Sequence, residues 1–315
     1  MLIVDPYQSF TMKRMAHISA CICTYKRPLL LQQLLSKLEQ QETEGLFDYS
    51  VVVVDNDVSE SARLTVESFA RRASVPVGYH VEPQQNIARA RNKAVENAKG
   101  DYIAFIDDDE FPDRTWLLKL YKTQVHHKSD GVLGPVLPYF EKEPPRWVVK
   151  GCFFDRPTHS TGQVLSWRNT RTGNVLLGRE LFQNGRQWFD PSLGSGGEDR
   201  DFFRRKIGEG HVFVWCNEAP VFETIPPARW KRTVLLKRAM IRGKMALNTT
   251  GSQAASTLKS MVAVVLYTLS LPFVSIMGHH VFMKCLIKDC DHLGKVCAFF
   301  GIDWVREKYV GGYQE

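Results

Sequence analysis

Four adjacent acids, from Asp107 to Glu110, directly follow the apolar run "YIAFI" at residues 102–106. Carboxylates this close together repel one another, so a folded chain needs a reason to place them here. A divalent cation would offset the repulsion, because Mg²⁺ and Mn²⁺ prefer hard oxygen ligands and keep positions open for phosphate oxygens. Solvated surface charge is the simpler alternative. The pattern therefore suggests a cation site that receives a phosphorylated ligand.

A second acidic pair, Glu198 and Asp199, follows the glycine-rich stretch "GSGG" at residues 194–197. Glycines let a backbone approach a substrate closely, and acids are favoured at the start of a helix by its dipole. A carboxylate beside a substrate hydroxyl can act as a general base. This pattern predicts a catalytic base, and a capping turn is the structural alternative.

Two further polar segments could bind a ligand. Asp55 and Asp57 end the run "VVVVDND", where a short acid can accept a hydrogen bond from a uracil ring or a ribose hydroxyl. The alternative is an N-cap for a helix at 60–72. In "NIARARN", Arg89 and Arg91 are two residues apart, so on a helix they face apart. We expect Arg91, with Asn92, to face the ligand.

Strand and helix patterns alternate through the first part of the chain. We predict strands at 17–25, 49–57, 77–83 and 101–110, and helices at 28–38, 61–73, 86–100 and 114–127. This alternation indicates a doubly wound α/β sheet with right-handed crossovers. Ligands of such sheets bind beyond the carboxyl ends of the strands, which brings the segments 24–27, 55–57 and 107–110 to one crevice. The lack of G-x-G-x-x-G after the first strand argues against a dinucleotide-binding domain.

The pattern is looser after residue 140. We predict a mobile loop at 141–157, a strand leading into a helix within 169–182, and one or two strands within 211–227. A basic helix is predicted at 229–247.

The C-terminal region combines positive charge with an apolar segment. Residues 224–260 contain eight lysines and arginines and no acid, which suits phosphate, lipid headgroups or nucleic acid. Residues 260–283 contain no charged side chain and are long enough to span a bilayer, although Pro272 weakens that interpretation. A buried helical hairpin is the alternative, and a spanning or an in-plane helix both remain open. The apolar segment makes lipid the better partner, so we predict no nucleic-acid partner.

Composition limits the broad class. The chain has 315 residues, 44% hydrophobic composition and a net charge of +7, enough for one large domain or a domain with an appendage. Its seven cysteines form no C-x-x-C pair, which predicts reduced core thiols in a cytosolic setting. Residues 1–16 lack an apolar signal core and are expected to form a flexible arm.

Seven motifs occur in a fixed order: "CTYKRP", "VVVVDND", "NIARARN", "AFIDDDE", "TGNVLL", "SGGEDRDFF" and "VFETIPPARW". Together they resemble family 2 inverting glycosyltransferases of the GT-A fold, over roughly residues 17–245. Within that family the chain is most similar to the bacterial exopolysaccharide glucosyltransferases of the succinoglycan type, which act on lipid-linked oligosaccharides. The resemblance implies a Rossmann-like, mixed and mostly parallel sheet flanked by helices. The basic and apolar composition of the C-terminal region adds a helical, membrane-associated appendage.

The resemblance also implies roles for the polar residues. The residues matching the nucleotide-sugar site are Thr24, Tyr25, Arg27, Asp55, Asn56, Arg91, Asn92, Asp107 and Asp108. Among these, Asp55 matches the acid that recognises uracil. Asp107 and Asp109 fill the outer positions of the D-x-D motif, and together they are the expected ligands of Mg²⁺ or Mn²⁺. Asp199 matches the general base, and Glu198 is expected to place the acceptor.

Two departures from the family pattern matter. Many GT-A enzymes supply a late histidine to the metal, whereas this chain has Glu223 at the matching place, as a ligand or an acceptor contact. The Q-x-x-R-W motif of processive synthases is absent, since "ARWKR" lacks the glutamine. We therefore expect addition of a single sugar.

The predicted organisation follows from these motifs. Residues 17–228 form the transferase domain, with a nucleotide-binding half (17–140) and an acceptor half (141–228), and residues 229–315 form a helical region. The implied function is hexosyl transfer from a nucleotide sugar, a UDP-hexose, to a lipid-linked glycan at the cytoplasmic face of a bacterial inner membrane. A nucleotidyltransferase and a non-catalytic scaffold of a polysaccharide assembly complex are the alternatives, and the oligomeric state is open.

Overall fold

The computed structural model describes residues 14–183, 185, 187–194, 196–248, 252–302 and 305, so most of the predicted N-terminal arm lies outside the described residues. The chain divides into two compact units. The first holds Met1–Val136 and Thr158–Val221, and the second holds Leu137–Pro157 and Phe222–Glu315. The predicted boundary after residue 228, between the transferase domain and the C-terminal helical region, stays a prediction.

A seven-stranded sheet forms the centre of the first unit. Its order is β3-β2-β1-β4-β8-β6-β9. The strands are β1 (Ala16–Thr24), β2 (Phe47–Asp55), β3 (Val77–Val81), β4 (Tyr102–Ile106), β6 (Gly131–Leu133), β8 (Asn174–Gly178) and β9 (Phe213–Trp215). The recorded pairings are parallel except those of β8, which runs antiparallel to both β4 and β6. The mixed, mostly parallel sheet predicted from the sequence is confirmed.

Alternating side chains of the central strands enter two separate cores. Val51 and Val53 of β2 pack in one hydrophobic cluster, whereas Val52 and Val54 pack in the other. A strand covered on both faces needs apolar residues at every position, which explains the run "VVVV". The sheet is therefore a buried middle layer between helices.

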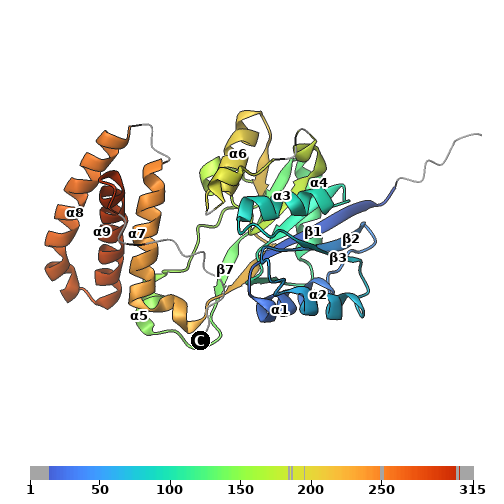
Figure 1. The fold of residues 1–315 in the computed structure, drawn as a ribbon, viewed down its shortest axis with the longest axis horizontal. Coiled ribbons are helices and arrows are strands. Elements are labelled where there is room, and N and C mark those ends of the chain that lie inside the picture. Colours follow the sequence, from blue (N-terminus) through green and yellow to red (C-terminus); the bar gives the residue numbers. More distant parts are fainter. Residues whose placement is uncertain are drawn as a thin grey trace, which may run out of the picture. The chain divides into compact units, whose positions relative to one another are not determined.

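Helices cover the two faces of the sheet. Side chains of α1 (Pro28–Leu38), α2 (Arg63–Ala70) and α4 (Trp116–His127) lie in the first cluster. Those of α3 (Ile87–Asn97) and α6 (Glu198–Gly208) lie in the second. Figure 1 shows α1 and α2 side by side, with α3 across the strands from them.

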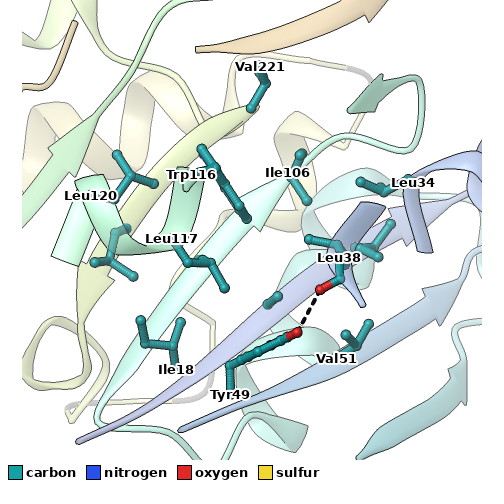
Figure 2. Close-up of a cluster of buried hydrophobic side chains, with 14 of the residues drawn as sticks. Ile18, Leu34, Leu38, Tyr49, Val51, Ile106, Trp116, Leu117, Leu120 and Val221 are labelled. Carbon is teal, nitrogen blue, oxygen red and sulfur yellow. Dashed lines mark hydrogen bonds between the residues drawn. The ribbon is translucent and has the colours of Figure 1, made fainter. Parts of the chain in front are cut away.

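The first cluster gathers residues from many parts of the first unit. Trp116, Leu117 and Leu120 of α4 lie near Ile18 and the leucines of α1 (Figure 2). The hydroxyl of Tyr49 reaches through this core and donates to the carbonyl of Leu38 at 2.8 Å. The core thus fixes α1 and α4 against the strands whose ends carry the polar residues.

The register of the sheet brings the polar strand ends together. Thr24 of β1 lies opposite Asp55 of β2, and β4 pairs in parallel with β1 on its other side. Because parallel strands end at the same edge, the segments after β1, β2 and β4 lie next to one another.

Some predicted elements differ from the structure. The segment 141–157 is not only a loop, because α5 (Arg146–Gly151) forms within it. Residues 131–140, for which no element was predicted, form β6 and β7 (Val136–Tyr139), with Pro135 between them. The expected helix after β8 is a 3-10 turn, Arg179–Phe182. The other short elements are β5 (Glu110–Pro112), β10 (Val221–Thr224) and 3-10 turns at Trp167–Asn169, Pro191–Leu193 and Pro227–Trp230.

Three long helices dominate the second unit. They are α7 (Arg232–Asn248), α8 (Gln253–Ile276) and α9 (His279–Phe299), and α9 lies between the other two (Figure 1). A Cβ on Gly243 of α7 or on Gly294 of α9 would clash with backbone of the opposite helix, so these glycines allow close packing. Among the described residues one helix, α8, is long and apolar enough to cross a membrane. Its bounds differ from the predicted segment 260–283, because α8 ends at Ile276 and α9 begins after Gly278, which has φ of 110°.

We predict that Leu34→Ala lowers the free energy of unfolding by about 2–5 kcal/mol, because Leu34 is fully buried in the first cluster and its truncation leaves a cavity. The matched control is Leu29→Ala on the same helix, where Leu29 is 74% exposed and a change within about 0.5 kcal/mol is expected. Denaturant unfolding measures both, and equal effects would contradict the packing described.

Candidate active site

The acids after β4 are balanced by arginines from elsewhere in the first unit. Arg27 Nη1 donates to Asp108 Oδ1 at 2.8 Å and lies 3.2 Å from Asp109 Oδ2. The Thr24 hydroxyl donates to the other oxygen of Asp108, also at 2.8 Å. Burial by itself would lower the pKa of Arg27, but the carboxylates of Asp108 and Asp109 outweigh it and raise that pKa. The middle acid therefore ties the end of β4 to the end of β1.

A second arginine joins the two acidic motifs. Arg91 Nη2 lies 3.5 Å from Asp107 Oδ1, and Arg91 Nη1 donates to Glu198 Oε1. Burial by itself would lower the pKa of Arg91, but Glu198 and Asp107 outweigh it and raise that pKa. Arg89 is exposed, so the two arginines face apart as the helical spacing predicts. Arg91 holds Asp107 and Glu198 in one cluster although α3 and α6 are far apart in the sequence.

Glu198 and Asp199 have different surroundings at the start of α6. Glu198 is buried, and its Oε2 has no hydrogen-bond partner among the residues that the structure describes. Burial raises the pKa of Glu198, and the Arg91 guanidinium opposes that shift. Asp199 is half-buried and accepts from the Arg200 backbone N–H at 2.7 Å. Gly197 precedes them with φ of 96°, a conformation that favours glycine.

The end of β2 is held by internal hydrogen bonds. Asp55 is fully buried and accepts from the backbone N–H of Ala62, at 2.7 Å, and from the Tyr79 hydroxyl, at 3.0 Å. Burial raises the pKa of Asp55, and these donors oppose it. Ala62 is the N-cap residue of α2 and α2 has no side-chain cap, so Asp55 is not the N-cap that the sequence left as the alternative. Its bond to the Ala62 N–H instead ties the end of β2 to the start of α2. Asn56 accepts from the Asn86 backbone N–H at 2.8 Å and fixes the start of α3.

Proteins of similar sequence identify the family of this chain. A model of glycosyl transferase family 2 matches residues 19–183. Over 232 residues the chain is 37% identical to the succinoglycan biosynthesis protein ExoM of Rhizobium meliloti (strain 1021), covering 72% of this chain and 73% of ExoM. The chain belongs to glycosyl transferase family 2.

Two further similarities extend this result. The UDP-Glc:alpha-D-GlcNAc-diphosphoundecaprenol beta-1,3-glucosyltransferase WfaP of Escherichia coli is 32% identical over 99 residues, which are 31% of this chain and 37% of WfaP. The crystal structure of S. aureus TarS 1-349 in complex with UDP-GlcNAc superposes with a TM-score of 0.52 and 16% identity, covering 94% of this chain and 95% of TarS 1-349. The GT-A fold implied by the motifs is confirmed.

The remaining predicted nucleotide contacts of this family 2 glycosyltransferase lie near the ends of the same elements. Tyr25 is half-buried directly after β1, and Lys26, with φ of 54°, lies over its ring at 5.2 Å from the centroid. Asn92 is buried, and its amide bonds both backbone groups of Phe189, at 2.8 and 2.9 Å. Asn92 therefore fastens α3 to the segment before α6.

Glu223 belongs to the second unit and is already paired. Its Oε1 lies 2.6 Å from Arg229 Nη1, and its Oε2 is paired with Arg156. Burial would raise the pKa of Glu223, but the two arginines outweigh it and lower that pKa. A cation would have to displace an arginine from either oxygen. The metal-ligand role predicted for Glu223 therefore gains no support from these contacts.

The acidic turn suits a cation that is brought by a diphosphate. The described residues contain no group of three or more His, Cys, Asp or Glu side chains that could hold a metal ion by themselves. Mg²⁺ sites of phosphate-transferring enzymes commonly use one or two carboxylates plus substrate phosphates. The Asp107 side chain is 46% exposed, and a Cβ on Gly173 would come within 3.0 Å of its Oδ2. The exposed Asp107 carboxylate, which lies 3.5 Å from Arg91 Nη2, would supply one such ligand.

Gly173 and Asn174 are site residues to which the sequence assigned no role. A Cβ at Gly173 would also come within 2.8 Å of Glu110 Oε1, so only glycine leaves room for the acids. Asn174 is fully buried, accepts from Trp116 Nε1 at 2.8 Å and donates to the Ala219 carbonyl at 2.8 Å. The sequence signal for these two residues is the pair "GN" directly before the apolar run "VLL".

We predict that Arg91→Ala lowers the free energy of unfolding by about 3–5 kcal/mol, because it leaves Glu198 buried without its counter-charge. Arg89→Ala is the matched control on the same helix, where the exposed side chain predicts a change within about 0.5 kcal/mol. Thermal and denaturant unfolding check both variants. Similar stability of the two would show that Arg91 does not hold the acidic motifs together.

Proposed function

We propose that the protein is an inverting hexosyltransferase that moves one sugar from a nucleotide sugar, a UDP-hexose, to a lipid-linked oligosaccharide in exopolysaccharide or surface polysaccharide biosynthesis. The observation that carries the proposal is the ion cluster of Arg91 with Asp107 and Glu198. It joins the motif expected to bind the donor to the motif expected to bind the acceptor. A transferase needs both substrates beside each other.

The relatives support both substrate classes. The name of WfaP gives a UDP-glucose donor and a diphosphoundecaprenol-linked acceptor. The crystal structures of TarS contain UDP and UDP-GlcNAc. ExoM is named for succinoglycan biosynthesis. These names favour a UDP-sugar donor and a polyprenyl-linked acceptor for the present chain as well. The proposed place of its reaction is the cytoplasmic face of a bacterial inner membrane.

The donor would bind at the edge formed by the ends of β1, β2 and β4. Asp107 and Asp109 would hold Mg²⁺ or Mn²⁺, which supplies Lewis-acid stabilisation of the leaving diphosphate. Both oxygens of Asp108 accept hydrogen bonds at 2.8 Å, from Arg27 and Thr24. The outer acids have longer pairings, Asp109 with Arg27 at 3.2 Å and Asp107 with Arg91 at 3.5 Å, so the cation would compete with weaker contacts there. The neighbouring strand β1 ends at Thr24 and is followed by Tyr25 and Arg27. These three residues suit the base and diphosphate of the donor.

The acceptor would bind at the start of α6. The acceptor hydroxyl attacks the anomeric carbon, its proton passes to the Asp199 carboxylate, and the bond from that carbon to the diphosphate oxygen breaks to release UDP. A single displacement of this kind inverts configuration, so an α-linked donor gives a β-linkage. Glu198, whose Oε2 has no hydrogen-bond partner among the described residues, would accept from an acceptor hydroxyl and orient it.

Asp199→Asn is expected to lower turnover at least about 10²-fold, because an amide cannot take the proton from the acceptor hydroxyl. The control is Asp201→Asn in the same turn of α6, where Asp201 accepts from Arg205 Nε at 2.8 Å and has no proposed substrate contact. Release of UDP in the presence of a lipid-linked acceptor measures both. Near-normal turnover of purified Asp199→Asn would remove this residue from the base role, and inactivity of the wild type with every acceptor would favour a scaffold.

Nucleotide binding is expected to depend on a divalent cation. UDP with Mn²⁺ should raise the melting temperature of the protein by mass action, and chelation of the metal should abolish the shift. Asp109→Asn should lose the metal-dependent part of the shift in melting temperature. Asp48→Asn, at an exposed aspartate, should keep that part. Thermal-shift titrations with and without Mn²⁺ decide this, and an equal shift in the presence of chelator would contradict a cation-bridged diphosphate.

A further inference from the structure

Helix α8 has its apolar side on the outside. Among the residues of the second unit that the structure describes, the large exposed apolar side chains of α8 are Leu258, Met261, Val262, Val265, Leu266, Leu269, Phe273 and Ile276. At the angular spacing of an α-helix these residues lie within an arc of about 140°. The helix is long and apolar enough to cross a membrane, and only 6% of its most apolar window is buried.

Helix α9 packs against the other side of α8, where apolar and polar side chains are mixed. Thr268 donates to Asp289 Oδ2 at 3.0 Å, and the Ser260 hydroxyl lies 3.2 Å from His292 Nδ1. Lys295 of α9 donates to the Ser256 hydroxyl at 3.1 Å. These contacts are spread along more than three turns of α8. The contact between α8 and α9 is therefore partly polar, and it leaves the apolar arc of α8 uncovered.

These polar contacts distinguish a spanning helix from an in-plane helix. If α8 crossed the bilayer with α9 beside it, Asp289, His292 and Lys295 would lie at hydrocarbon depth, where ionisable side chains are costly. If α8 lies along the surface, its apolar arc enters the lipid while the side that faces α9, and α9 itself, stay in the headgroup region or water.

The charge of the helices α7, α8 and α9 favours anionic lipid as the partner of the apolar arc. From residue 232 to 302 the chain has nine lysines and arginines against two aspartates. One of the aspartates, Asp291, is paired with Arg242 Nη2 at 3.0 Å. Lys259 on α8 and Lys284 and Lys288 on α9 are exposed. Basic side chains beside an apolar arc match a surface of acyl chains under anionic headgroups.

We propose that α8 is an in-plane membrane-docking helix whose outward apolar arc inserts into the surface of an anionic lipid bilayer, while α9 covers its other side. The proposal rests on the helices α7, α8 and α9 of the second unit. It therefore stands or falls separately from the transferase chemistry, because it is tested by lipid binding and not by turnover.

The test is co-sedimentation of the full chain with vesicles made of equal parts phosphatidylglycerol and phosphatidylcholine. Wild-type protein should pellet with these vesicles, less with pure phosphatidylcholine, and should be released by alkaline carbonate. The double variant Leu266→Glu and Leu269→Glu should partition at least about tenfold less, because it places charge in the apolar arc. Leu64→Glu is the matched control, since Leu64 is 81% exposed on α2 and outside the arc.

Three outcomes would overturn the proposal. Unchanged binding of the double variant would show that the arc does not meet lipid. Resistance of the wild type to carbonate extraction would show that α8 spans the bilayer. A dimer in the absence of vesicles that the double variant abolishes, as measured by size-exclusion chromatography with light scattering, would show that a second copy of the chain covers the arc. Circular dichroism confirms that the variant keeps its helices.

Discussion

The candidate site depends on a buried arginine held between two acidic motifs. Arg91 of α3 contacts Asp107 at the end of β4 and Glu198 at the start of α6. A buried charge is tolerated only when it is paired, so this cluster forces three separate segments into one fixed arrangement. Arg27 has the same effect on Asp108 and Asp109. The crowded acids are thus partly neutralised by the protein itself, before any cation or substrate binds.

The fold supplies what this charge cluster needs. Because β1, β2 and β4 are parallel neighbours, their polar ends share one edge of the sheet. The antiparallel strand β8 begins at Asn174, next to Ile106 of β4, and places Gly173 beside the acids where no side chain would fit. Asn92 fastens α3 to Phe189, which keeps Arg91 directed at the start of α6. These contacts hold the carboxylates in position in advance of the reaction, which is the arrangement that charge stabilisation requires.

The sequence predicted the elements whose signals are local. Apolar periodicity located β1 to β4 and the helices between them, and helical spacing separated Arg91 from Arg89 correctly. It missed the ion pairs, because Arg27 and Asp108 are 81 residues apart and only the folded sheet brings them together. It also missed the end of α8, since the uncharged run continues past Gly278, where the backbone turns. Periodicity alone does not identify α9 as the partner of α8. The sequence therefore does not show which side of α8 is covered and which side is exposed.

We propose that the acids after β4, held by two arginines, receive a cation and the diphosphate of a sugar donor. The decisive test is a crystal structure of the protein with UDP and Mn²⁺. We expect the cation at Asp107 and Asp109, the diphosphate on it, and Arg91 still bonded to Glu198. A nucleotide bound elsewhere, with those acids surrounded only by water, would contradict it.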